Sequence, residues 1–419
     1  MTASWIFLAV ALMVQQPDTR ITVTRDQHRV IAIPEFAGAA APFHVTLWAD
    51  IEESGLFEMR SPSFYPKQPP SQPAAFQPAD WQGVDYVAIG YTSMLDSKLV
   101  LSGWALDAHT GAQILGNRYV ASNDAAGLRR AAHEFAADII RRFGGKPMYG
   151  SRIYFRSNRS GADEIWSIDT DGSDPRQITR VKGLVMTPGV SPDGTRIAFT
   201  SDAEFPQKLF VYTTDPPRRI PFENPAASLT TTPEFTPDGR RMVFASSATK
   251  DGCCGLFIAD LDGKNRRLIA SSHGADTEPK VNPKNPNEIA FVSDRGGLPQ
   301  IYRMNLDGLD VERLTNGQGE AANPSWSPDG VHLAFAWTAG FAPGNWNIFV
   351  MDTVKREPVQ LTHGEGRNEN PVWAPDGVHL AFTSTRSGSE QIWIMLADGS
   401  RPPRQLTHEG RNRSPAWSR

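Results

Sequence analysis

The stretch NPSWSPDGVHLAF, residues 323–335, decides the fold, because it recurs as NPVWAPDGVHLAF at 370–382. The last residues, NRSPAWSR at 412–419, repeat its beginning and then stop. Related apolar runs place six phenylalanines in register at intervals of 44 to 47 residues: Phe155, Phe199, Phe244, Phe291, Phe335 and Phe382. A repeat of this length, built from short strand patterns, predicts β-propeller blades rather than helical repeats.

Each repeat carries four strand patterns. In residues 323–362 they are PSWS, VHLAFAWT, WNIFVMD and PVQLT. A Pro-Asp-Gly turn separates the first two, since Pro presets φ, Asp bonds to its own backbone and Gly adopts positive φ. Asp-Gly pairs in most repeats suit the hairpin between the third and fourth strands. Each repeat is therefore predicted to form one four-stranded antiparallel blade.

Ring closure explains why the last copy is short. The first repeat begins at Arg152 and lacks a preceding Pro-x-Trp strand, and the segment at 414–418 is that missing innermost strand. Joining the two segments in one blade removes two exposed strand edges. We predict a mainly β protein whose residues 149–419 form a six-bladed β-propeller closed by the C-terminal strand.

Residues 17–148 show no such repeat and are predicted to form a small α+β domain. The strand patterns RVIAIPEF (29–36) and KLVLSGWALD (98–107) occur with two helical patterns. In the second helix Leu128, Ala132, Phe135 and Ile139 share one face, Asp124 can cap the start, and Gly144 can end it. The Pro-rich stretch at 61–78 predicts an extended surface loop.

The apolar run WIFLAVALMV at 5–14 predicts a signal peptide over residues 1–16. It is about half the roughly 20 residues that a membrane-spanning helix needs. Residues 1–14 contain no Lys or Arg, and a misassigned start codon is one explanation. The formal net charge is only -4, and the sequence contains no stripe of basic residues. Nucleic acid is therefore not an expected partner. The adjacent Cys253 and Cys254 are interpreted as loop thiols.

Catalytic and metal motifs are incomplete. The nucleophile elbow Gly-x-Ser-x-Gly of a propeller-bearing peptidase is missing. HEFAAD (133–138) begins like His-Glu-x-x-His, but Ala137 occupies the second ligand position, so His133 is expected to support the helix surface. DTDGSD (169–174) lacks the Glu that closes a calcium loop. We expect no catalytic residues, no metal and no cofactor.

Several blocks resemble the TolB family, the periplasmic propeller proteins of the Tol-Pal system. RITVTRDQHRVIAIPEFAG is similar to the family's mature N-terminus and first strand. DIEESGLFE, DYVAIGY, SGWALDAHTGAQILGNRYV and LRRAAHEFAADII resemble its other first-domain blocks, and SRIYFRSNRSG resembles the start of its propeller. The Pro-Asp-Gly repeat occurs in many unrelated propellers, so the ordered first-domain blocks carry the resemblance.

The resemblance implies an adaptor and not an enzyme. A TolB-like protein resides in the periplasm, binds the lipoprotein Pal through its propeller and TolA through its N-terminal segment, and supports outer-membrane integrity and envelope constriction at division. Outer-membrane proteins are possible further partners, and a monomer is expected. The TolA-binding residues would be Thr19, Arg20, Ile21, Thr22 and Val23, whose β-prone sequence suits strand addition to a partner. An ordinary frayed terminus is the alternative.

The Pal-binding face is predicted from the blade direction. Loops that cross from the outer strand of one blade to the inner strand of the next share one channel mouth with the loops between second and third strands, and loops on a rigid scaffold often carry recognition. The candidates are Thr187, Thr232, Glu278, Asn323, Arg367, Asn370, Arg411 and Arg413. Alternatively, each polar residue before Pro caps a strand or turn. An exported propeller enzyme or small-ligand binder using the central channel is the alternative function.

Overall fold

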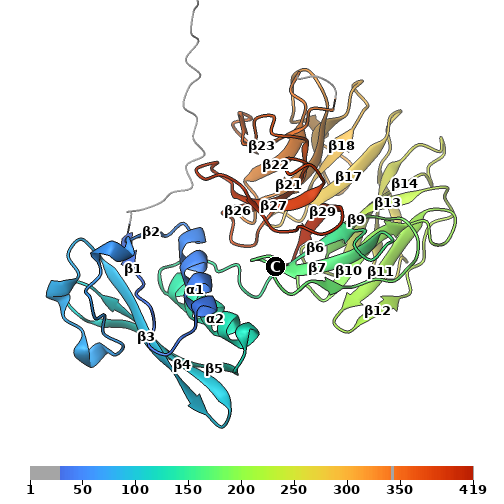
Figure 1. The fold of residues 1–419 in the computed structure, drawn as a ribbon. Coiled ribbons are helices and arrows are strands. Elements are labelled where there is room, and N and C mark those ends of the chain that lie inside the picture. The colour runs from blue at the N-terminus through green and yellow to red at the C-terminus, as the bar shows by residue number, and fades with distance from the viewer. Residues whose placement is uncertain (1–28, 341–343, 419) are drawn as a thin grey trace, which may run out of the picture.

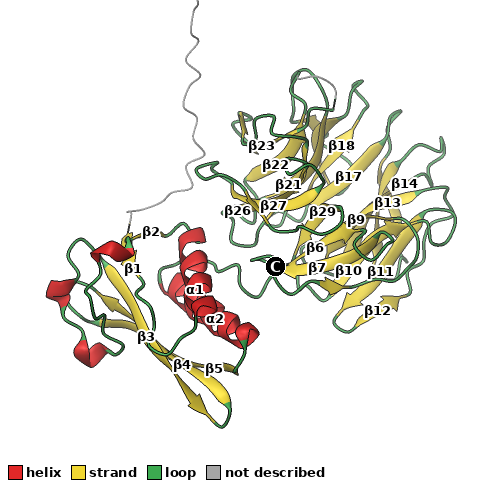
Figure 2. Ribbon diagram, viewed as in Figure 1, coloured by secondary structure: helices red, strands yellow, loops and turns green. Residues whose placement is uncertain are grey.

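The structure, a computed structural model, describes residues 29–340 and 344–418. Domain 1, the described residues up to 148, lies beside a ring of six four-stranded sheets (Figure 1). Strands dominate, and both α-helices of the described residues belong to domain 1 (Figure 2). The predicted fold class, a six-bladed β-propeller preceded by a small α+β domain, is confirmed.

Domain 1 contains a five-stranded sheet in the order β2-β1-β3-β4-β5. Strand β1 pairs in parallel with β2 and β3, and the remaining pairs are antiparallel. The strands are β1 (Arg29–Ala32), β2 (Phe57–Met59), β3 (Tyr86–Leu95), β4 (Lys98–Asp107) and β5 (Gln113–Ser122). Strand β1 ends at Ala32, before the end of the apolar run at 29–36. The run contains Pro34, which lacks the backbone N–H that would extend the hydrogen-bonded ladder.

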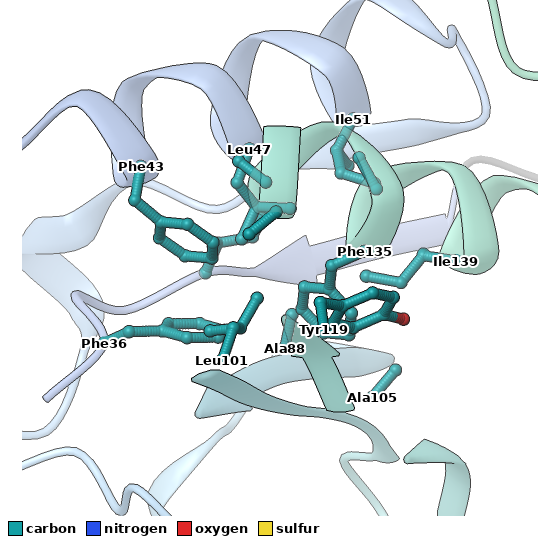
Figure 3. Close-up of a cluster of buried hydrophobic side chains, with 14 of the residues drawn as sticks. Phe36, Phe43, Leu47, Ile51, Ala88, Leu101, Ala105, Tyr119, Phe135 and Ile139 are labelled. Carbon is teal, nitrogen blue, oxygen red and sulfur yellow. The ribbon is translucent and has the colours of Figure 1, made fainter. Parts of the chain in front are cut away.

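Helices α1 (Ala41–Glu53) and α2 (Ala125–Arg142) cover one face of this sheet. The Asp124 side chain accepts a hydrogen bond from the Gly127 backbone N–H at 2.7 Å, which confirms the predicted cap. Figure 3 shows the apolar side chains that fill the space between helices and sheet, among them Phe43, Leu101 and Phe135. The expectation that His133 supports the helix surface is wrong, because its side chain is only 9% exposed.

The Pro-rich segment covers part of the other sheet face. It forms three single turns of 3-10 helix, each beginning at a proline, rather than a fully extended loop: Pro62–Phe64, Pro73–Ala75 and Pro78–Asp80. Phe76 of this segment and Trp81 shortly after it pack against Val87, Ile89 and Leu106 of the sheet. Both faces of domain 1 are therefore buried over part of their area.

The propeller strands are given blade by blade, from the channel outward. Blade 1 contains β29 (Asn412–Trp417), β6 (Arg152–Ser157), β7 (Glu164–Asp169) and β8 (Arg176–Gln177). Blade 2 contains β9 (Val185–Val190), β10 (Arg196–Ser201), β11 (Lys208–Thr214) and β12 (Pro217–Ile220). Blade 3 contains β13 (Thr230–Phe235), β14 (Arg241–Ser246), β15 (Gly255–Asp260) and β16 (Arg267–Ala270).

The other three blades follow the same plan. Blade 4 contains β17 (Asp276–Val281), β18 (Glu288–Ser293), β19 (Gln300–Asn305) and β20 (Glu312–Arg313). Blade 5 contains β21 (Ala321–Trp326), β22 (His332–Trp337), β23 (Asn347–Asp352) and β24 (Pro358–Gln360). Blade 6 contains β25 (Asn368–Trp373), β26 (His379–Ser384), β27 (Gln391–Leu396) and β28 (Arg404–Gln405).

The predicted ring closure is confirmed. Strand β29 pairs antiparallel with β6, with Asn412 opposite Ser157 and Trp417 opposite Ile153. All six phenylalanines that define the repeat are completely buried within the blades. Within the described part of the chain, the helices are too short or too polar to cross a membrane.

Candidate protein-binding mouth and central channel

The innermost strands share a backbone irregularity that positions side chains in the channel. Each has a β-bulge where it pairs with the second strand of its blade. At the bulge a residue other than glycine adopts a φ between 46° and 55° and precedes a proline. We call these residues the left-handed ring: Thr187, Thr232, Glu278, Asn323, Asn370 and Ser414. All six line one cavity along the propeller axis.

Side chains of the ring connect neighbouring blades. The backbone N–H of Glu278 donates to the Thr232 hydroxyl at 3.2 Å, and that of Asn323 donates to the Glu278 carboxylate at 2.6 Å. The backbone N–H of Asn370 donates to the Asn323 side-chain oxygen at 3.1 Å. These bonds pass from blade 3 to blade 6 around the channel. The five predicted residues of the ring therefore lie together, and at least three of them also have a structural role.

An acidic group sits in the wall of this ring. Burial raises the pKa of the Glu278 carboxyl, and the hydrogen bonds from Asn323 oppose that shift. Further along the same strands, the Lys280 ammonium lies 2.6 Å from the Glu234 carboxylate, so this charged pair joins β17 to β13. Groups of three or more side chains suited to a metal ion do not occur among the described residues.

The channel cavity has a volume of about 170 Å³. Its walls combine the ring with prolines and with three tryptophans, Trp326, Trp373 and Trp417. The Trp326 indole N–H donates to the Lys280 carbonyl at 3.0 Å, and the Trp417 indole N–H donates to the Ser151 hydroxyl at 2.9 Å. The channel lining therefore combines indole and proline surfaces with the polar side chains of the ring and, further along, the Lys280–Glu234 pair.

The predicted arginines lie outside this cavity lining. The Arg367 side chain is 53% exposed and its Nε lies 2.5 Å from Glu369. The Arg413 guanidinium pairs with Glu390 at 2.6 Å and is 34% exposed. Arg411 is exposed, and its backbone N–H donates to the Asn158 side-chain oxygen at 2.7 Å. All three belong to the crossing-loop mouth, which we define as the channel mouth surrounded by the blade-to-blade crossing loops.

Two features of this mouth were not predicted. Ser414 is the sixth member of the ring, and aligning the residue before each innermost-strand proline would have identified it. Phe205 lies in the loop between β10 and β11, and 92% of its surface is exposed. Its neighbour Glu204 accepts from Arg219 and Lys208, which hold that loop against β11 and β12. The predicted TolA-binding residues at 19–23 lie outside the described part of the chain.

Comparisons with known proteins agree with this architecture. The sequence model of the TolB beta propeller domain family matches residues 141–336 and 314–419. A TolB homolog from Chlorobium luteolum is 35% identical over 292 residues, which are 70% of this chain and 65% of that protein. The Tol-Pal system protein TolB of Bordetella pertussis is 38% identical over 185 residues, 44% of this chain and 42% of that protein.

The chain thus matches less than two thirds of the length of these curated relatives. Among solved structures, TolB from Acinetobacter baumannii superposes with a TM-score of 0.79, covering 94% of this chain and 97% of that one at 24% identity. At that identity the superposition establishes the fold alone, and its coverage of this chain extends over both domains. Because the propeller family matches more than half of the sequence, the chain belongs to the TolB family.

Proposed function

We propose that this protein is a non-enzymatic adaptor of the Tol-Pal system in the periplasm, where it binds Pal through the propeller and TolA through its N-terminal segment. Family membership carries the proposal, and the fold shared with TolB from Acinetobacter baumannii over 94% of this chain supports it. The name of the Bordetella relative connects that protein with the Tol-Pal system. In this role the protein supports outer-membrane integrity and envelope constriction at division.

The crossing-loop mouth is the proposed Pal-binding face. Its loops stand on a ring that is braced by hydrogen bonds between blades, so a partner would meet a surface that is already ordered. Arg367, Arg411 and Arg413 supply charge at this mouth, and the exposed Phe205 supplies an aromatic contact of the kind that dominates interface energies. The left-handed ring lies behind these loops.

The N-terminal segment is the proposed TolA-binding element. Residues 19–23 precede β1, which starts at Arg29 and lies between β2 and β3 in the domain 1 sheet. A short segment rich in β-branched residues can add as a strand to the sheet edge of a partner, with main-chain hydrogen bonds providing affinity. Its distance along the chain from the propeller loops makes the two binding events separable by mutation.

The experiment is calorimetric titration of the purified protein with the Pal domain encoded by the same organism. We expect saturable one-to-one binding that weakens roughly tenfold or more when Arg367, Arg411 and Arg413 are all replaced by Glu. The matched control replaces Arg218, Arg240 and Lys264 by Glu. These substitutions give the same charge change at the opposite side of the propeller, where Arg240 and Lys264 lie on turns and Arg218 lies in β12 next to the β11–β12 turn.

Each result has a clear meaning. Loss of binding in the mouth variant, with normal binding in the control, supports the proposed face. Equal binding by both variants contradicts the assignment of the mouth. If the unmodified protein does not bind Pal at tens of micromolar, the adaptor proposal itself fails, and the channel cavity becomes the site to screen for a ligand.

A further inference from the structure

Domain 1 contacts two places on the ring that lie on opposite sides of its closure. The closure is the pairing of β29 with β6, which we call the seam. The turn between β7 and β8 follows β6, whereas the turn between β27 and β28 precedes β29. Helices α1 and α2 lie on the side of domain 1 that faces the propeller (Figure 1). Side chains of these helices contact both turns.

On the β6 side, the contact is centred on His133 of α2. Its Nδ1 lies 2.6 Å from the Asp50 carboxylate of α1, and its Nε2 lies 3.4 Å from the Asp171 carboxylate in the β7–β8 turn. The ring of Tyr149, in the segment that leads into the propeller, stacks on the imidazole at 5.1 Å. An imidazole with both nitrogens protonated can donate to both carboxylates, so His133 joins the two domains.

On the β29 side, two arginines of blade 6 reach α1. Arg404 presents Nε at 2.8 Å and Nη2 at 3.0 Å to the two carboxylate oxygens of Glu53. Arg401 donates to the Glu52 carbonyl at 3.1 Å. The Arg404 guanidinium also donates to the Asp171 carbonyl at 3.4 Å, so it contacts the turn on the other side of the seam as well.

The segment between the domains contributes to the same place. Ser151 accepts the Trp417 indole N–H at 2.9 Å, and the Ser418 hydroxyl accepts the Arg152 backbone N–H at 2.7 Å. Met148 packs against the cluster that contains Ile153 and Trp417. Ring closure joins residues 266 positions apart, which costs conformational entropy of the chain. A second connection across the seam lowers the probability that the seam opens.

We infer that domain 1 is a strap across the propeller seam, fastened to one side through His133 and Asp171 and to the other through Glu53 and Arg404. The contacts are charged and hydrogen-bonded, and the arginine fork fits its carboxylate in a bidentate geometry. In this arrangement the docking of domain 1 and the closure of the ring stabilise one another. The inference does not depend on the proposed Pal or TolA binding.

The test is amide hydrogen exchange of the full-length protein, comparing the seam strands β29 and β6 with β17 and β18 on a remote blade. We expect Arg404→Glu to speed exchange at the seam by about tenfold or more while β17 and β18 stay within about twofold. Combining Arg404→Glu with Glu53→Arg should return the seam to within about twofold of the unmodified protein, because the ion pair is restored with reversed signs.

A matched control is Arg303→Glu in blade 4, which breaks a comparable pair with Glu312 at 2.7 Å. Its effect should remain in blade 4. Unchanged seam exchange in Arg404→Glu overturns the strap, and so does a double variant that fails to recover. If Arg404→Glu does not fold, the milder His133→Gln is used to compare amide exchange at the seam with exchange in β17 and β18. Exchange that speeds up equally in all blades of this variant contradicts the inference.

Discussion

Asn323 shows how one side chain of the channel serves two neighbouring blades. Its backbone N–H and side-chain NH₂ donate to Glu278, and its side-chain oxygen accepts the backbone N–H of Asn370. The sequence allowed two interpretations of this position, a Pal contact or a strand cap. The hydrogen bonds give Asn323 a structural role, and its proposed part in Pal binding stays a prediction.

Asn323→Ala should lower the free energy of unfolding by about 1–3 kcal/mol, because it leaves the Asn370 N–H and a Glu278 oxygen without partners. The matched control is Asn265→Ala. Asn265 has a similar positive φ of 49°, but it is exposed and its side chain donates to Asp260 of the same hairpin instead of joining two blades. Urea denaturation of both variants provides the comparison, and equal losses would contradict a special role for the ring.

His133 gives the domain interface a dependence on pH. Burial by itself would lower its pKa, but hydrogen bonds to Asp171 and Asp50 and the charges of these residues raise it to about 10 from the usual 6.5. The stabilisation is therefore complete below about pH 6.5 and is lost as the pH rises through about 10. It should decline by at most about 1.4 kcal/mol per pH unit in that window.

The measurement is urea denaturation from pH 6 to 9.5 for the unmodified protein and for His133→Gln. Other groups titrate in this range in both proteins, so the difference between the two curves isolates His133. The difference should be largest near pH 6 and shrink towards pH 9.5. A constant difference would show that His133 does not bind its proton more tightly in the folded protein.

At the scale of elements, the innermost strands pack closely around the axis. Gly189 of β9 occupies a position where the other five blades have a side chain. A Cβ added there would lie 2.4 Å from the Pro233 carbonyl oxygen of β13, which is shorter than any normal contact. The backbones of β9 and β13 therefore approach more closely than a side chain at this position permits.

Gly189→Ala should cost about 1–3 kcal/mol of folding free energy, because β9 and β13 must separate to admit the methyl group. Thermal unfolding measures the loss. Exchange of the amides in blades 2 and 3 should rise more than in blade 5. A variant as stable as the unmodified protein would show that the two strands can separate freely.

Much of the order of strands and blades could be predicted from the sequence. The Pro-Asp-Gly turns identify blades through short-range backbone chemistry, and the spacing of residues such as Phe335 does so because each blade repeats one buried position. The bulges were not predicted, since the left-handed conformation occurs at Thr, Glu, Asn and Ser rather than at Gly. The role of His133 was missed because its partner Asp171 lies in another domain, and no local pattern reveals such a contact.

At the scale of the whole molecule, the two proposed binding sites belong to different parts of the chain. Residues 19–23 precede domain 1, whereas the crossing-loop mouth belongs to the propeller. Deletion of residues 1–24 should therefore abolish TolA binding and leave Pal affinity within about twofold. Pull-down with the TolA domain and calorimetry with Pal measure the two effects. Loss of both interactions would show that the sites are not independent.

The position of β29 has a consequence for biosynthesis. Arg152 and Ser418, which bond at the seam, are separated by 266 residues, so a nascent chain exposes the inner edge of β6 until β29 has left the ribosome or a translocation pore. Until β29 has been made, the ring stays open, and β6 keeps an unpaired inner edge while the intervening blades are synthesised. In that interval β6 presents an open β-sheet edge, which is the kind of surface that a chaperone protects from aggregation.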